Sequence, residues 1–233
     1  MQKNILITGR PGSGKSTLLR KLIGRIPAKE GFVTNEILGE HGRLGFEVET
    51  RSGSKAVLAH INFNTPRKVS KYFVDIGSLE SMLPAVSDFK DGGILYLDEI
   101  GQMQLFSERF KDLVLRYLDA RNTCIATLSS VFEDGFTDAI RKRDDIVLVE
   151  ISAANREEQE VFITQLLKKI EKARKYSSEP ERFTRTESGI ELHSEHGTRT
   201  LVHTEGKWHC DCEFFKRYGI CSHAIAAGEF ARM

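Results

Sequence analysis

The sequence is poor in cysteine and tryptophan and has no long run of apolar residues. Its 233 residues include four cysteines, one tryptophan and five prolines. No stretch approaches the roughly 18 consecutive apolar residues that a membrane-spanning helix requires, so we expect no such helix. The formal net charge is only +1, and the overall charge therefore favours neither nucleic acid, nor a membrane surface, nor an acidic substrate as a partner.

The composition is that of a globular protein with enough apolar residues for a core. Hydrophobic residues make up 40% of the chain and charged residues 29%. The length suits one large domain, or one domain with a small appendage. The first residues, MQKNILITGRPGSGK, do not resemble a signal peptide, because their apolar run is short and leads into glycines. We therefore expect a cytoplasmic protein, in which clustered cysteines indicate a metal site more often than disulfides.

The first 170 residues alternate apolar strand-like runs with amphipathic stretches, which is typical of an α/β sheet. Buried strands are predicted at 3–9, 92–100, 124–130 and 146–152. Helices are predicted at 15–26, 79–89, 105–120 and 156–176. Three segments with alternating polarity and glycine turns, at 31–37, 42–50 and 54–60, predict a β-meander inserted after the first helix.

The composition changes after this region. Residues 166–186 contain seven Lys/Arg against three Asp/Glu, and SSEPERF interrupts the helical pattern. Short alternating segments follow, and SHAIAAGEF predicts a final short helix. We therefore predict a first domain over 1–174, a basic linker over 175–186 and a small second domain over 187–233.

The segment GRPGSGKS, residues 9–16, fits the phosphate-binding pattern G-x-x-x-x-G-K-[ST]. It lies between a predicted buried strand and an amphipathic helix, which is the context that the pattern requires. Backbone N–H groups and the positive end of the helix would bind the phosphates. Lys15 would contact the β- and γ-phosphates, and the Ser16 hydroxyl would coordinate Mg²⁺. The expected nucleotide-binding residues here are Gly9, Arg10, Pro11, Gly12, Ser13, Gly14, Lys15, Ser16 and Thr17.

A pair of carboxyl groups follows the second predicted buried strand, in ILYLDEIG. An acid at the end of such a strand is the expected second half of the nucleotide site. Asp98 would hold Mg²⁺, and Glu99 would orient the attacking water or accept its proton. A solvated turn is the alternative for this pair, and the phosphate loop upstream favours the functional interpretation.

Several segments together resemble the THEP1-type nucleoside-triphosphatases. These segments are ILITGRPGSGKSTLLRKL, GFVTNEI, GRLGF, LDEIGQMQLFS and AANRE, in this order, and the resemblance covers about residues 1–172. It implies a RecA-like P-loop NTPase fold, a three-layer α/β sandwich with a β-rich insertion. It also implies hydrolysis of nucleoside 5′-triphosphates, such as ATP and GTP, to diphosphates with Mg²⁺. By the same resemblance, the nucleotide site extends over Asp98, Glu99, Ile100, Gly101 and Gln102.

A cation that stabilises the transition state is harder to identify from the sequence. Arg10 lies within the loop and is the favoured candidate. Arg141 and Arg143 end a predicted helix, and Arg156 begins another, where a surface charge is the more common role. Two residues of the strand predicted at 124–130 are further candidates. Thr127 is a candidate sensor of the γ-phosphate, with a purely strand-forming role as the alternative, and Cys124 is predicted to be an inert core thiol.

Three of the four cysteines lie in CDCEFFKRYGICSH, residues 210–223. Cys210, Cys212, Cys221 and His223 supply the four ligands of a closed, structural zinc site. The intervening residues predict a loop in which Gly219 allows the chain to return. The pattern resembles a SWIM-type zinc module, and we expect a small zinc-binding ββα-like module here.

The charge of this second module does not decide which class of partner it binds. Residues 183–233 contain six Lys/Arg against seven Asp/Glu, whereas phosphate contacts require positive charge. SWIM modules are associated with nucleic-acid or protein contacts, and a protein partner is at least as well supported as nucleic acid.

Two other functions compete with NTP hydrolysis. A nucleotide or nucleoside kinase uses the same phosphate loop, and FEDGFTDAIRKRDD, residues 132–145, is the only candidate for its arginine-rich lid. A nucleotide-gated switch would hydrolyse slowly and hold a partner through the second module. Phosphate release without an acceptor would distinguish the hydrolase from the kinase, and stimulation by a ligand of the second module would indicate the switch.

Overall fold

The structure is a computed structural model that describes residues 2–232. It divides into a larger unit, residues 3–160, and a smaller unit that contains residues 161–232 together with Gln2. None of its described helices is long and apolar enough to cross a membrane.

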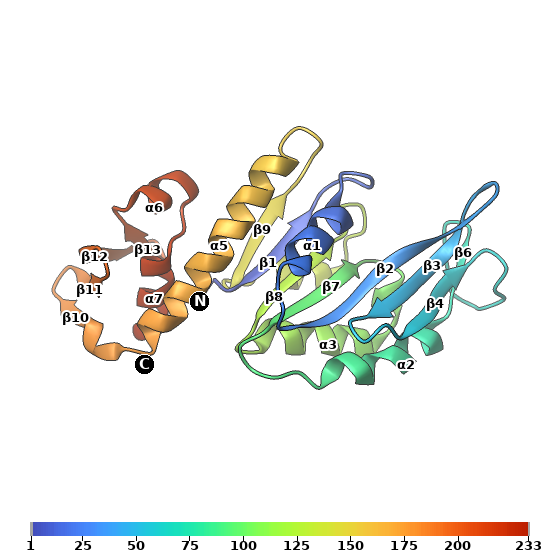
Figure 1. Ribbon diagram of the computed structural model, residues 1–233, viewed down its shortest axis with the longest axis horizontal. Coiled ribbons are helices and arrows are strands. Elements are labelled where there is room, and N and C mark those ends of the chain that lie inside the picture. Colours follow the sequence, from blue (N-terminus) through green and yellow to red (C-terminus); the bar gives the residue numbers. More distant parts are fainter. Residues whose placement is uncertain (1, 233) are drawn as a thin grey trace. The chain divides into compact units, whose positions relative to one another are not determined.

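The larger unit contains a nine-stranded mixed sheet (Figure 1). The strands are β1 (Asn4–Thr8), β2 (Lys29–Gly39), β3 (Gly42–Thr50), β4 (Lys55–His60), β5 (Lys68–Val69), β6 (Tyr72–Val74), β7 (Ile94–Ile100), β8 (Thr123–Leu128) and β9 (Ile146–Glu150). Their order in the sheet is β5-β6-β4-β3-β2-β7-β8-β1-β9. The neighbours from β2 to β9 are parallel, which confirms the predicted α/β architecture.

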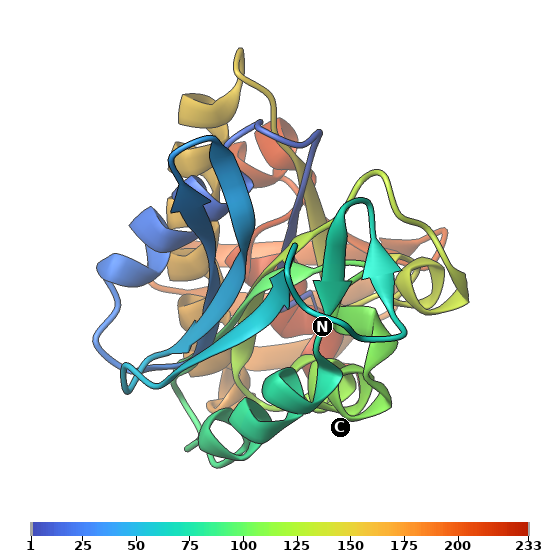
Figure 2. The same ribbon diagram turned by 90° about the vertical axis from the view of Figure 1, so that its right-hand side faces the viewer.

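The predicted meander forms the antiparallel extension of this sheet. Strands β2, β3 and β4 pair antiparallel in sequence order, and β2 also pairs parallel with β7. Figure 2 shows β2 and β3 in blue as a long twisted hairpin. The short strands β5 and β6, which the sequence analysis did not predict, complete this edge. The insertion is therefore continuous with the central sheet.

Helices connect the parallel strands. The helices are α1 (Lys15–Gly24), α2 (Ile76–Ser87), a 3₁₀ helix (Gln104–Phe106), α3 (Glu108–Asp119), α4 (Gly135–Arg141) and α5 (Arg156–Ser177). Polar side chains begin three of them, because a side-chain oxygen can accept from the free N–H groups of the first turn. Asp75 accepts from Ser78 N at α2, and Ser107 accepts from Phe110 N at α3. Asp134 forms a capping box at α4.

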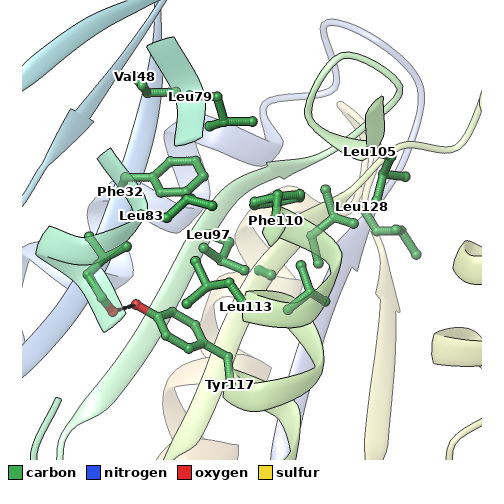
Figure 3. Close-up of a cluster of buried hydrophobic side chains, with 14 of the residues drawn as sticks. Phe32, Val48, Leu79, Leu83, Leu97, Leu105, Phe110, Leu113, Tyr117 and Leu128 are labelled. Atoms are coloured by element: carbon green, nitrogen blue, oxygen red, sulfur yellow. Dashed lines mark hydrogen bonds between the residues drawn. The ribbon is translucent and has the colours of Figure 1, made fainter. Parts of the chain in front are cut away.

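A large apolar cluster lies between the sheet and helices α2 and α3 (Figure 3). Apolar side chains of α3 at Phe110, Leu113 and Tyr117 are buried, as their helical spacing predicts. Tyr117 donates its hydroxyl proton to the backbone of α2, so this buried polar group is satisfied. Leu6 of β1 belongs to this cluster, whereas Ile5, on the other face of the strand, does not. Helix α1 contacts β1, β7 and β8.

The smaller unit is built on a four-stranded antiparallel sheet. Its strands, in both sequence and spatial order, are β10 (Phe183–Thr186), β11 (Gly189–Ser194), β12 (Gly197–Thr204) and β13 (Lys207–Cys210). A 3₁₀ helix (Pro180–Arg182) precedes them, and α6 (Glu213–Tyr218) and α7 (Ser222–Phe230) follow. Helix α7 contacts β11, β12 and β13. The Phe183 and Phe230 rings stack with their centroids 4.5 Å apart.

Regular structure occupies two segments that the sequence analysis describes as a linker and as a loop. The proposed linker, residues 175–186, consists of the end of α5, the second 3₁₀ helix and β10, and the compact units divide at residue 161. The expected loop between Cys212 and Cys221 contains α6. Gly219 ends this helix with φ 68°, the left-handed conformation in which the chain reverses.

Candidate functional sites

The phosphate loop connects β1 to the first turn of α1. Its glycines are required by its geometry: a Cβ on Gly9 would lie 2.3 Å from the Ile151 carbonyl oxygen, and Gly14 has φ 93°. The Lys15 Nζ donates to the carbonyl oxygens of Gly9, at 3.0 Å, and Arg10, at 3.5 Å. The loop therefore holds the lysine ammonium over its own backbone.

Asp98, near the end of β7, lies opposite the start of α1. Its carboxylate is fully buried, and Oδ1 accepts from the Ser16 hydroxyl at 2.8 Å and from the Thr127 hydroxyl at 2.7 Å. Oδ2 accepts no hydrogen bond and lies 3.7 Å from the Arg20 guanidinium. Burial raises the pKa of Asp98, and these hydroxyls and Arg20 act in the opposite direction. A buried carboxylate with one unpartnered oxygen beside a serine hydroxyl suits a divalent cation.

Glu99 follows Asp98 and is half-buried. Burial raises the pKa of its carboxyl group, and the nearby Lys15 ammonium opposes that rise. A carboxylate whose proton affinity is increased in this way is a better proton acceptor.

One cavity of about 540 Å³ contains both halves of the site. Ten of the predicted nucleotide-site residues line it: Pro11, Gly12, Gly14, Lys15, Ser16, Thr17, Asp98, Glu99, Gly101 and Gln102. The insertion contributes residues of β2, β3 and β4 to the wall, and the loop after β8 contributes Ser129 to Phe132. The strand order β7-β8-β1 explains why these distant segments meet at one edge of the sheet.

Four predicted residues lie outside the cavity wall. Gly9 and Ser13 belong to the phosphate loop, and the Ser13 hydroxyl is buried without a hydrogen-bond partner. Ile100 is buried in the core and accepts a backbone hydrogen bond from Ser129. Arg10, the favoured transition-state cation, is exposed.

The other arginine candidates also lie outside the wall. Arg141 donates to Ser129 O at 2.7 Å and to Glu133 at 3.1 Å. Arg143 forms ion pairs with Asp145 and Asp119. Arg156 lies against the phosphate loop, since its guanidinium would be 2.6 Å from a Cβ on Gly14.

The structure also locates the two remaining candidates of the strand that is now β8. Thr127 is fully buried, and its hydroxyl donates to the Asp98 carboxylate, so a hydrogen bond fixes its place next to Asp98. Cys124 is fully buried, and burial raises the pKa of its thiol to about 12. A thiol with that pKa is not a nucleophile near neutrality, in agreement with the predicted inert role.

Three residues of the site were not identified from the sequence. Arg20 lies on α1 one turn after Ser16 and donates to Thr34 O at 2.6 Å. The Thr34 hydroxyl donates to Asp98 O, which joins β2 to β7 at the cavity. Arg43 of β3 lines the cavity itself. The spacing of Arg20 from Ser16 on one helix face is the signal for Arg20, and GFVTNEI and GRLGF, which carry the family resemblance, contain Thr34 and Arg43.

The four predicted zinc ligands lie together in the smaller unit. The ligand atoms of Cys210, Cys212, Cys221 and His223 are all within 4.8 Å of one another. Cys210 ends β13, Cys212 and Cys221 precede α6 and α7, and His223 lies in the first turn of α7. The His223 Nδ1 is 3.6 Å from the Cys210 Sγ and 3.9 Å from the Cys221 Sγ.

The larger unit thus has the fold and the phosphate loop of the P-loop NTPases. A family model described as "NTPase" matches residues 4–164, and the chain belongs to this family. Nucleoside-triphosphatase THEP1 of Thermotoga maritima is 36% identical over 154 residues, which are 65% of this chain and 88% of that protein. The cancer-related nucleoside-triphosphatase of Homo sapiens is 30% identical over 67% of this chain and 92% of its own length. The crystal structure of THEP1 from Aquifex aeolicus superposes with a TM-score of 0.64 at 31% identity, covering 70% of this chain and 98% of that one.

Proposed function

We propose that this protein hydrolyses nucleoside 5′-triphosphates to diphosphate and phosphate with Mg²⁺. The observation that carries the proposal is the buried Asp98 carboxylate, held by Ser16 and facing the cavity that Lys15 and Glu99 also line. Membership of the NTPase family supports the same activity. The position of β8 between β1 and β7 in the sheet supports a RecA-like arrangement.

The residues of the site have separate roles in this reaction. Lys15 and the backbone N–H groups of the loop bind the β- and γ-phosphates. Ser16 and Asp98 are the residues that would hold Mg²⁺, because the donors are hard oxygen atoms and one of them lacks a partner. When bound, Mg²⁺ neutralises the charge of the phosphates.

Glu99 acts on the attacking water. The water oxygen forms a bond to the terminal phosphorus, and the bond from that phosphorus to the bridging oxygen of the β-phosphate breaks. Nucleoside diphosphate is the leaving group, and Glu99 accepts the proton that the water loses. Glutamate suits this step here because its burial raises its pKa.

Hydrolysis is favoured over phosphoryl transfer to another acceptor. In residues 132–145, the candidate lid under the rival kinase function, Arg141 and Arg143 are both engaged in ion pairs. A phosphate-release assay on the full chain, with ATP, GTP, CTP and UTP and Mg²⁺ but no acceptor, tests this. Release of phosphate supports the hydrolase, and transfer that requires an added nucleoside or nucleotide would overturn it.

We further propose that the part of the smaller unit from residue 187 onward is a SWIM-type module with one structural zinc ion. Three thiolates and one imidazole form a closed set of four soft or borderline ligands. In a tetrahedron, a zinc–sulfur bond of about 2.3 Å and a zinc–nitrogen bond of about 2.0 Å place the nitrogen about 3.5 Å from each sulfur. The His223 Nδ1 lies 3.6 Å from the Cys210 Sγ, which fits this geometry, and 3.9 Å from the Cys221 Sγ, which is somewhat longer. The module would recruit a protein or nucleic-acid partner, and the thiols would stay reduced in the cytoplasm.

Cys212→Ser is expected to remove the zinc and unfold the smaller unit, because metal binding supplies much of the folding free energy of such a small module. Wild type should contain one zinc per chain and lose it on acidification, as the ligands must be deprotonated. Metal analysis and circular dichroism measure both effects, and phosphate release should stay near the wild-type rate.

His209→Gln is the matched control for this experiment. His209 lies next to Cys210, and its ring contacts Phe215 with the centroids 5.7 Å apart, outside the ligand cluster. This variant should keep its zinc. Wild-type protein without metal and with a Cys210–Cys221 disulfide would contradict the zinc assignment, and loss of basal turnover in Cys212→Ser would contradict the independence of the two units.

A further inference from the structure

We propose that Arg43 of β3 is the cation that contacts the terminal phosphate during hydrolysis, an assignment that rests on the proposed function. Among the described residues that line the cavity, Arg43 and Lys15 are the only cations. Lys15 is directed by its own loop toward the β- and γ-phosphates. The charge that develops on the terminal phosphate as its bond breaks needs a second cation, and a guanidinium can bind two phosphate oxygens at once.

Two residues of the insertion hold the Arg43 guanidinium at the cavity. Its Nη2 lies 3.1 Å from the Glu36 Oε1, and its central carbon lies 5.2 Å from the centroid of the Phe46 ring. Glu36 and Phe46 also line the cavity. The Phe46 ring packs edge-on against Tyr72, with the centroids 5.1 Å apart. Arg43 therefore rests on an aromatic support that is continuous with the core.

The pairing of the strands determines this placement. Glu36 of β2 is the register partner of Phe46, and Leu38 is the partner of Arg43. A bulge between Ile37 and Leu38 interrupts the register between these two pairs. Bulges increase the local twist and redirect side chains, and they often occur next to active sites.

The ion pair with Glu36 can be exchanged for a contact with phosphate. The Arg43 and Glu36 side chains are 42% and 51% exposed. An ion pair in contact with water contributes little to stability. A phosphate that carries up to two negative charges, in a site from which the nucleotide excludes water, is the stronger partner for Arg43. Glu36 thus holds the arginine at the cavity between turnovers.

The other arginines that lie near the site have different partners. Arg20 donates to Thr34 O and lies beside the Asp98 carboxylate. Arg141 is bound to Ser129 O and Glu133. Neither of them lines the cavity, and neither do Arg10 and Arg156.

The experiment compares the turnover and the binding of Arg43→Ala, Arg43→Gln and Arg43→Lys in the full chain. We expect kcat to fall roughly 10²-fold or more in the alanine and glutamine variants, toward the 10³–10⁵ range of arginine fingers. Arg43→Lys keeps the charge without the paired donors, and it should show an intermediate loss. Affinity for ADP should not change, because ADP lacks the terminal phosphate. The gain in affinity when aluminium fluoride is added to Mg-ADP, which imitates the transferring phosphoryl group, should be lost.

Two controls separate a local effect from a general one. Lys55→Ala removes a cation of the same insertion that pairs with Glu47 and Glu49 outside the cavity, and it should keep wild-type turnover. Glu36→Gln removes the ion pair that holds Arg43 at the cavity, and it should lower kcat by less than Arg43→Ala does. Arg43→Gln keeps most of the aliphatic part of the side chain next to Phe46. If Arg43→Ala does not fold, Arg43→Gln is measured in its place.

Each outcome decides the assignment. Turnover of the folded Arg43 variants at the level of Lys55→Ala would overturn it, and so would an equal loss of ADP and ATP binding. If Lys15→Ala and Glu99→Gln lose hydrolysis while the Arg43 variants keep it, only the role of Arg43 fails. If wild type releases no phosphate, the proposed function itself fails.

Discussion

Lys15→Ala is expected to abolish NTP hydrolysis, with a loss of at least roughly 10³-fold in phosphate release. The Lys15 ammonium is the cation that the loop itself holds, through Gly9 O and Arg10 O. A bound triphosphate would accept the same donors at its β- and γ-oxygens. Removing them leaves the negative charge of the phosphates uncompensated at the start of α1.

The measurement is phosphate release with ATP and GTP, with Lys21→Ala as the control. Lys21 lies on the same helix and pairs with Glu160 at 2.6 Å, away from the cavity wall. The control should hydrolyse at the wild-type rate. Near-normal turnover in Lys15→Ala would show that the loop is not a phosphate site.

Glu99→Gln is expected to reduce turnover by roughly 10²-fold or more and to leave nucleotide binding nearly intact. Glutamine has the shape of glutamate but cannot accept the proton of the attacking water. The half-buried position of Glu99 beside Asp98 makes this isosteric replacement preferable to alanine, which would open the site to solvent.

Binding of ADP and ATP and single-turnover hydrolysis measure the two effects separately. Glu108→Gln, at the exposed first turn of α3, is the control for loss of a carboxylate. It should bind and hydrolyse nucleotide as wild type does. A variant at position 99 that loses binding and hydrolysis to the same extent would make Glu99 a structural or cation-binding residue.

The parts of the fold that depend on local patterns were predicted from the sequence. The apolar runs that became β1, β7, β8 and β9 are buried strands, and the helical spacing around Phe110 and Tyr117 gives α3. The strands β5 and β6 were missed, because two or three residues carry no periodicity. Helix α6 was missed because its six residues make fewer than two turns, too few for a helical period to be recognised.

The residues of the candidate site also fall into two groups, those that a local sequence pattern predicts and those that it does not. The phosphate loop and the Asp98-Glu99 pair have local signatures, and the structure places them in one cavity. Arg43 and Thr34 lie in GRLGF and GFVTNEI, segments that carry the family resemblance but do not show that these side chains belong to the site. They reach the cavity because β2 pairs with β7 and β3 pairs with β2, and this order of strands is a property of the whole sheet. Arg10 was the favoured candidate because it lies within the motif, but a place in the motif does not direct an exposed side chain inward.

The position of β1 in the sheet also affects how the protein is made. Ile5 pairs with Ile125 of β8 and with Val147 of β9, so β1, which precedes the other strands of its unit along the chain, has its two neighbours among the last of them. At typical rates of synthesis, an apolar strand would wait on the order of 10 s for its partners. Closing such long-range pairs is also slow in the complete chain. Nascent chains shorter than about 150 residues are therefore expected to lack nucleotide binding and to need protection from aggregation, although the whole phosphate loop is complete by residue 16.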